Sequence, residues 1–299
     1  MKTKIKSTVL LFLTAIIWGF AVVAQCIGAD FVGPFTFNGV RFLLGGLSLI
    51  PVILIFEKEK FNKDKFLKTL FVGLIAGVAL FAGASLQQFG IEITGSAGKA
   101  GFLTGLYTVF VPIIRFMLGK RTSIFSFIGA AFATGGLFLL CMTGDKLTLG
   151  TGDILLIIGA VLWAVHILVV DKFVNSVSPI KFSMTQFIVC GILSLTFALF
   201  TEDIQLSAIR SAGIPILYSG LLSVGVAYTC QILGQKDSDP TFAAIIFSTE
   251  AIFGAIGGAL ILHEIMSYRG YFGCVLIFIG IVLSQLDLKT IQKLIKSKK

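Results

Sequence analysis

Ten long apolar blocks dominate this chain, and they leave almost no sequence from which a soluble domain could fold. A helix needs about 20 mainly apolar residues to cross a bilayer, and each block is close to that length. The sequence therefore predicts an all-α polytopic membrane protein with ten transmembrane helices. The predicted spans are 7–27, 35–56, 67–90, 97–118, 122–142, 152–173, 179–200, 211–234, 240–262 and 269–287.

The few charged residues lie mainly between these blocks and at the chain ends. Only 13% of the 299 residues are charged, against roughly 25% in a soluble domain. If ten helices alternate from a cytoplasmic N-terminus, the cytoplasmic segments hold 18 of the 24 lysines and arginines, and the outer segments hold four. Loops that are rich in lysine and arginine stay on the cytoplasmic side of a membrane. The bias predicts a multi-pass plasma-membrane protein with cytoplasmic N- and C-termini, and it explains the net charge of +9 without a nucleic-acid partner.

The chain also contains an internal repeat of five helices. We place the first repeat at 7–142, the second at 152–287, and a basic cytoplasmic tail at 288–299. Residues that coincide at a shift of 145 or 144 include Trp18 with Trp163, Pro34 with Pro179, Phe37 with Phe182, Phe42 with Phe187, and Gly129 with Gly273. Because each repeat has an odd number of spans, the second must enter the membrane from the opposite side. The sequence therefore predicts inverted repeats, an architecture of secondary transporters with the substrate site between the halves.

Prolines mark several of the predicted helix boundaries. Pro34, Pro179 and Pro240 stand at the starts of apolar blocks, where the missing N–H of proline costs nothing. Pro112 lies inside the fourth block, so we expect it to kink that helix.

Several short stretches, spread over nearly the whole chain, indicate a family. They are Ile17-Trp18-Gly19, Arg41-Phe42, the segment from Ser96 through Gly119-Lys120-Arg121, the segment Asp239-Pro240-Thr241-Phe242-Ala243-Ala244, and His263-Glu264. In the order and spacing of these stretches the chain resembles the EamA-like family of ten-helix carriers in the drug/metabolite transporter superfamily. The resemblance implies movement of small metabolites, often amino acid export, with cytoplasmic termini. It does not imply a particular substrate.

Glu250 is the main candidate for a binding residue because it lies halfway along the ninth predicted span. A charge at the bilayer centre costs at least about 2.5–3.5 kcal/mol, so it should face a cavity or a partner. We hypothesise that Glu250 lines a central cavity and binds a substrate amine or a coupling proton. The alternative is a neutral carboxyl that forms a hydrogen bond between helices.

Arg41 is the second charged candidate, about two turns into the second span. It could bind a carboxylate, or it could pair with an acid and lock a gate. The alternative is an arginine whose long side chain reaches the outer interface.

The two tryptophans, Trp18 and Trp163, are repeat mates that lie well inside their spans. Facing tryptophans could wall an apolar substrate pocket from both sides, or they could simply pack in the core. Helical spacing puts Gln25 on the Trp18 face and His166 on the Trp163 face. His166 could relay protons, or it could be a hydrogen-bonded structural residue.

Other polar residues inside the spans complete the candidate set. Neutral amides and phenols suit zwitterionic or polar organic substrates, although hydrogen bonds between helices use the same residues. These candidates are Gln88, Tyr107, Gln186, Tyr228 and Gln231, with Gln87 beside them.

The sequence favours a carrier over other membrane proteins. It contains no GxxxxGK[ST] stretch for ATP and no HExxH motif, and with two histidines it predicts neither a cofactor nor a metal site. A membrane-embedded enzyme would need a catalytic cluster, and the best candidate, His263-Glu264, lacks a clear nucleophile. A channel would need a pore-lining helix, which is not evident in the sequence. We therefore predict a secondary transporter that acts as a monomer or weak dimer and exports amino acids or related metabolites.

Overall fold

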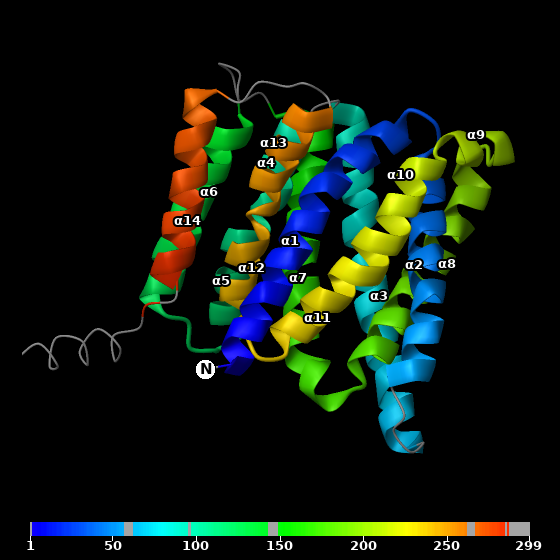
Figure 1. The fold of residues 1–299 in the computed structure, drawn as a ribbon, viewed down its shortest axis with the longest axis horizontal. Helices are drawn as coiled ribbons and strands as arrows, with labels where there is room; N and C mark the ends of the chain where they lie inside the picture. Colours follow the sequence, from blue (N-terminus) through cyan, green and yellow to red (C-terminus); the bar gives the residue numbers. More distant parts are fainter. Residues whose placement is uncertain are drawn as a thin grey trace, which may run out of the picture.

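A computed structural model describes residues 2–56, 62–94, 97–142, 149–261, 267–284 and 286. Every element in this part of the chain is a helix (Figure 1). The first repeat contains α1 Lys2–Ala29, α2 Pro34–Phe56, α3 Lys63–Thr94, α4 Ala97–Gly105, α5 Tyr107–Met117 and α6 Ile124–Cys141. The second contains α7 Thr151–Phe173, η1 Val174–Ser176, α8 Pro179–Thr201, α9 Leu206–Ser211, α10 Gly213–Leu217, η2 Tyr218–Tyr228, α11 Thr229–Gln235, α12 Pro240–Phe247, α13 Glu250–Ile261 and α14 Tyr268–Ser284.

The described helices confirm an all-α membrane protein with nine or ten spans. Nine helical stretches of the described residues are long and apolar enough to cross a membrane, and α14 is a tenth, shorter apolar helix of 17 residues. The predicted helix starts at Pro34, Pro179 and Pro240 are confirmed. The predicted tail, 288–299, and the pair His263-Glu264 lie outside the described residues.

Matching helices of the two repeats pack against one another. In Figure 1, α6 lies beside α14 at one edge of the bundle and α2 lies near α8 at the other. Between these pairs, α3 packs against α7 and α8, and the equivalent helical stretch α10–η2–α11 packs against α1 and α2. The core is therefore an interface between the repeats.

Glycines bring the backbones of α6 and α14 into contact. A Cβ atom on Gly136 would lie 2.5 Å from the carbonyl oxygen of Gly273, and one on Gly129 would lie 2.6 Å from the carbonyl oxygen of Gly280. Small residues allow this close approach of helices in lipid. The shift of 144 that relates the repeats turns one of these contacts into the other.

The fourth and ninth spans are each interrupted in the middle, between α4 and α5 and between α12 and α13. The break in the fourth span lies at Leu106, whereas Pro112, at which we predict a kink, lies inside α5. The ninth span breaks at the equivalent point without a proline in α13. There the Ser248 and Thr249 hydroxyls donate to carbonyl oxygens three residues earlier, at 2.6 and 2.7 Å, and so compete with the helical backbone bonds.

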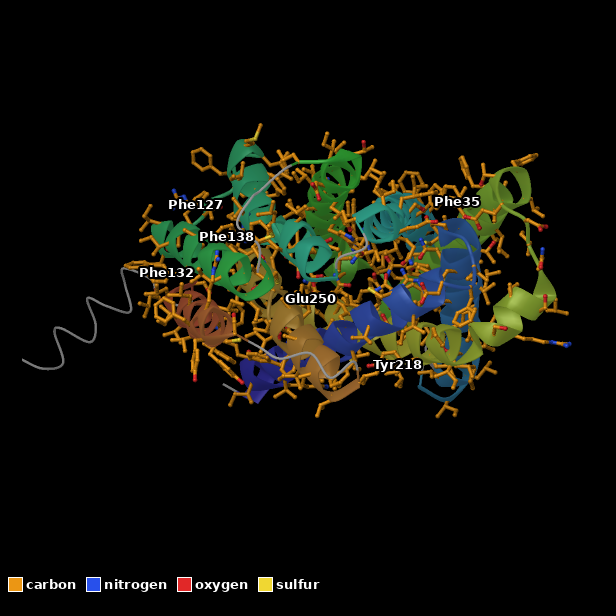
Figure 2. All side chains as sticks on the ribbon, turned by 90° about the horizontal axis from the view of Figure 1, so that it is seen from above. Phe35, Phe127, Phe132, Phe138, Tyr218 and Glu250 are labelled. Carbon is orange, nitrogen blue, oxygen red and sulfur yellow. The ribbon has the colours of Figure 1, made fainter. Side chains whose placement is uncertain are left out.

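Side chains sort by depth in the bundle, as seen from above in Figure 2. Glu250 lies near the middle, whereas Phe127 and Phe132 lie at the periphery. Phe132 is exposed, as expected for a side chain that faces lipid. The centre of the bundle, where Glu250 lies, is also where the two repeats meet.

Candidate functional site

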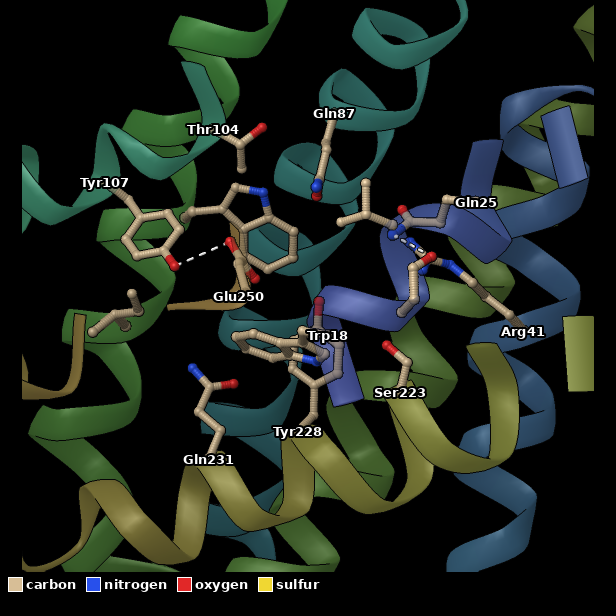
Figure 3. A pocket seen from close by; sticks show the side chains of 14 residues that line it. Trp18, Gln25, Arg41, Gln87, Thr104, Tyr107, Ser223, Tyr228, Gln231 and Glu250 are labelled. Carbon is tan, nitrogen blue, oxygen red and sulfur yellow. Dashed lines mark hydrogen bonds between the residues drawn. The ribbon is translucent and has the colours of Figure 1, made fainter. Parts of the chain in front are cut away.

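A cavity lies at the centre of the bundle and takes its walls from both repeats (Figure 3). Seven of the ten predicted site residues line it, and their role in binding remains a prediction. They are Trp18, Arg41, Tyr107, Trp163, Tyr228, Gln231 and Glu250. The other lining residues are Ala21, Val22, Gln25, Gln87, Thr104, Ile167 and Ser223.

Three aromatic rings form the apolar part of this cavity. The ring centroid of Tyr228 lies 4.6 Å from that of Trp18 and 6.1 Å from that of Trp163. Both tryptophans line the cavity, and each packs against the same tyrosine ring. Tyr228 ends the π-helix η2, a rare geometry that is frequent at functional sites. The rings offer flat surfaces to an apolar or aromatic group.

Tyr107 and Glu250 form a hydrogen bond across the repeat interface. The Tyr107 hydroxyl donates to Glu250 Oε1 at 3.1 Å (Figure 3). Each is the first residue of the second half of a broken span, α5 and α13, and a shift of 143 relates them. The Glu250 carboxyl thus lines the cavity and also forms a hydrogen bond between two helices. The two alternatives that the sequence left open for this residue are therefore compatible.

Arg41 lines the cavity from α2 with 2% of its surface exposed. Its Nε donates to Asn38 Oδ1 at 2.9 Å, and its guanidinium carbon lies 5.4 and 4.9 Å from the ring centroids of Phe37 and Phe42. No carboxylate among the described residues forms an ion pair with it. The side chain therefore does not reach out to a membrane surface, and it presents an unneutralised cation to the cavity.

Three predicted site residues do not line the cavity: Gln88, His166 and Gln186. All three are fully buried in helix packing. His166 Nε2 donates to Gln186 Oε1 at 2.9 Å, and Gln88 Nε2 donates to the Gln25 carbonyl at 3.3 Å. In this conformation their polar groups turn toward neighbouring helices, and their part in binding stays a prediction.

Two polar lining residues, Thr104 and Ser223, were absent from the sequence predictions. Hydroxyl side chains inside helices commonly bond to their own backbone, so their presence in a span is a weak signal. Gln87 and Gln88 are adjacent, and only the helix packing decides that Gln87 is the one that faces the cavity.

The residues that line the cavity reach toward both ends of α1. Gln25 lies near the end of α1. Gln231 lies in α11, which packs beside the start of α1, where the Ser7 hydroxyl donates to the carbonyl oxygen of Gly234.

On the N-terminal side, polar contacts join the two repeats. Arg115, near the end of α5, forms an ion pair with Asp239 at the start of α12. Ser7 of α1 shares a hydrogen bond with Ser238 at 2.7 Å. These contacts hold the repeats together on the side of the bundle where α1 begins.

Known proteins match this chain over nearly its full length. The EamA-like transporter family matches residues 5–142 and 150–286, one copy for each repeat. The chain belongs to the EamA-like transporter family. Membership in this family makes the protein a membrane transporter, and it removes the alternative of a membrane-embedded enzyme.

Individual EamA relatives agree with this assignment. An uncharacterized transporter of Archaeoglobus fulgidus is 29% identical over 284 residues, which cover 92% of this chain and 84% of the relative. The uncharacterized transporter YoaV of Bacillus subtilis is 22% identical over 278 residues, covering 90% and 93%. The uncharacterized inner membrane transporter YedA of Escherichia coli is 26% identical over 155 residues, covering 52% and 49%.

A solved structure shows the same fold as this EamA-family chain. One crystal structure superposes with a TM-score of 0.78 over 93% of this chain and 95% of the other, at 16% sequence identity. At that identity the likeness establishes the fold and carries no information on the substrate.

Proposed function

We propose that this EamA-family transporter is a secondary carrier that moves a small organic metabolite by alternating access between two inverted repeats. The observation that carries the proposal is the central cavity, which joins a buried arginine, a carboxyl and three aromatic rings from both repeats. Secondary transporters with inverted repeats place their substrate sites at such an interface, often beside broken helices. Here the broken spans supply Tyr107 and Glu250.

Helix packing supports the inverted relation between the repeats. The contacts of Gly129 with Gly280 and of Gly136 with Gly273 exchange under the repeat shift, as a two-fold axis requires. We assign the repeats to 7–142 and 152–287 and a cytoplasmic tail to 288–299. The excess of lysine and arginine in alternate segments supports cytoplasmic termini in the plasma membrane.

Amino acids or related metabolites are the substrate class that the cavity favours, and we propose export as the direction. Figure 3 shows Arg41 and Glu250 on opposite sides of the pocket, with Trp18 and Tyr228 between them. A guanidinium suits a carboxylate because its fork can donate two parallel hydrogen bonds. Glu250 would bind an amine or exchange a proton, and the rings would hold an apolar side chain.

Counterflow in proteoliposomes tests this function. Protein reconstituted with an unlabelled amino acid inside should accumulate the same labelled amino acid transiently and saturably, with radiolabelled phenylalanine, leucine and threonine as separate probes. An ion current that does not saturate would indicate a channel instead. Absence of counterflow with every amino acid, in protein that elutes as a single species, would contradict the substrate class.

Replacing Glu250 by glutamine tests its part in transport. Glu250→Gln keeps the shape of the side chain and removes its charge and its proton, so we expect counterflow to be lost or its pH dependence to disappear. Glu92→Gln is the matched control, because Glu92 lies on α3 with an exposed side chain outside the cavity. Transport with unchanged pH dependence in Glu250→Gln would remove the proposed role.

A further inference from the structure

The three predicted site residues outside the cavity share one property. Each has a repeat mate that lines the cavity. At a shift of 145, Gln186 corresponds to Arg41, and His166 corresponds to Ala21. At a shift of 143, Gln88 corresponds to Gln231. One member of every pair therefore lines the cavity while the other is buried behind it.

Other pairs of mates line the cavity together. Trp18 and Trp163 both do so, as do Tyr107 and Glu250. Val22 and Ile167, related by the shift of 145, form a third such pair. These three pairs are shared equally by the repeats, whereas Arg41, Ala21 and Gln231 line the cavity without their mates.

The buried set carries polar atoms without partners. His166 Nδ1, Gln186 Nε2 and Gln88 Oε1 are buried and have no hydrogen-bond partner among the described residues. A buried polar group without a partner is destabilising, by about 1–3 kcal/mol. A conformation that opened this region to water or substrate would satisfy all three atoms.

We propose that Gln88, His166 and Gln186 line the cavity in the opposite access state, where they replace Gln231, Ala21 and Arg41. This inference rests on the proposed alternating access. When one inverted repeat adopts the conformation of the other, the environments of repeat mates exchange. The tryptophans, Tyr107 and Glu250 stay at the centre in both states, so a substrate keeps those contacts throughout the cycle.

The exchange changes the charge that a substrate meets. In the state described here the cavity presents the guanidinium of Arg41, whereas the opposite state would present the neutral amide of Gln186 beside the His166 imidazole. Neutral hydrogen bonds to an anion are weaker than charge-assisted ones. A substrate carboxylate would therefore be held more tightly in the state that exposes Arg41 than in the state that exposes Gln186.

Thiol labelling tests the exchange without knowledge of the substrate. The five cysteines are replaced by alanine, and Arg41→Cys or Gln186→Cys is added, with His166→Cys as a second reporter. A membrane-impermeant, positively charged methanethiosulfonate is applied to one face at a time. Ala160→Cys is the matched control, since Ala160 and its mate Ala15 are both fully buried.

We expect Arg41→Cys to react from one face, and Gln186→Cys and His166→Cys to react from the other. The labelling rates of Gln186→Cys and His166→Cys should be lower in proportion to the population of the minor state, which is about 0.1–10% for a typical two-state protein. Ala160→Cys should not react. The inference is overturned if Gln186→Cys and His166→Cys both react from the Arg41 face, or from neither face, while the cysteine-free parent protein shows counterflow. Labelling as expected, with no amino acid counterflow by that parent protein, would instead contradict the proposed substrate class alone.

Discussion

The contact between α6 and α14 gives the sharpest prediction about the stability of the fold. A methyl group added at Gly136 would lie 2.5 Å from the Gly273 carbonyl oxygen and 2.7 Å from Ile277 Cγ1. The nearest group is backbone, which cannot rotate away, so Gly136→Ala must push the two helices apart. At the preceding residue, Gly135, an added methyl would have no other atom within 4 Å.

The two alanine substitutions should therefore have opposite effects. Overpacking costs about 1–3 kcal/mol, which corresponds to a loss of about 2–12 °C in Tm for Gly136→Ala. Gly135→Ala meets no steric obstacle and gains helix propensity of up to about 1 kcal/mol. Its Tm should stay the same or rise. Gly273→Ala, which meets the Gly136 carbonyl oxygen at 2.5 Å, should behave like Gly136→Ala.

Thermal unfolding of the purified protein in detergent micelles measures this difference. The fraction that still elutes as a single species after heating gives a midpoint for each variant at equal protein and detergent concentration. Equal midpoints for Gly136→Ala and Gly135→Ala would refute the argument that backbone contact between α6 and α14 holds the repeats together.

Two further predictions concern the cavity and the ion pair on the N-terminal side of the bundle. Arg41→Lys keeps the charge but loses the fork, so binding of a carboxylate substrate should weaken by about 1.5–3 kcal/mol, or roughly 10- to 150-fold, in a counterflow titration; unchanged affinity would exclude carboxylate binding by Arg41. Arg115→Gln removes the exposed ion pair with Asp239, worth about 0.2–1 kcal/mol, and should raise the population open on the N-terminal side by roughly 1.4- to 5-fold. Distances between spin labels at exposed Leu118 and Asp237 would report that opening, and identical distance distributions with and without Arg115 would show that the ion pair does not restrain the repeats.

The sequence by itself determined the helical spans and their repetition. In lipid every backbone polar group must be satisfied within its own helix, so a long apolar block has few alternatives to a spanning helix. The helix starts at Pro34, Pro179 and Pro240 followed from the local geometry of proline, because its missing N–H costs nothing at the first position of a helix. Spans and helix starts depend on residues that are close together in the sequence, so the sequence is enough to predict them.

Only the tertiary structure decided which polar residues meet at the cavity. Gln87 faces it while Gln88 does not, and Arg41 faces it while its mate Gln186 lies buried against His166. The break in the fourth span likewise lies at Leu106, away from Pro112. These outcomes depend on how each helix is rotated and packed against the other repeat. Two repeats of similar sequence can occupy different environments in one conformation. The packing of the whole bundle therefore decides which residue of each pair of mates faces the cavity.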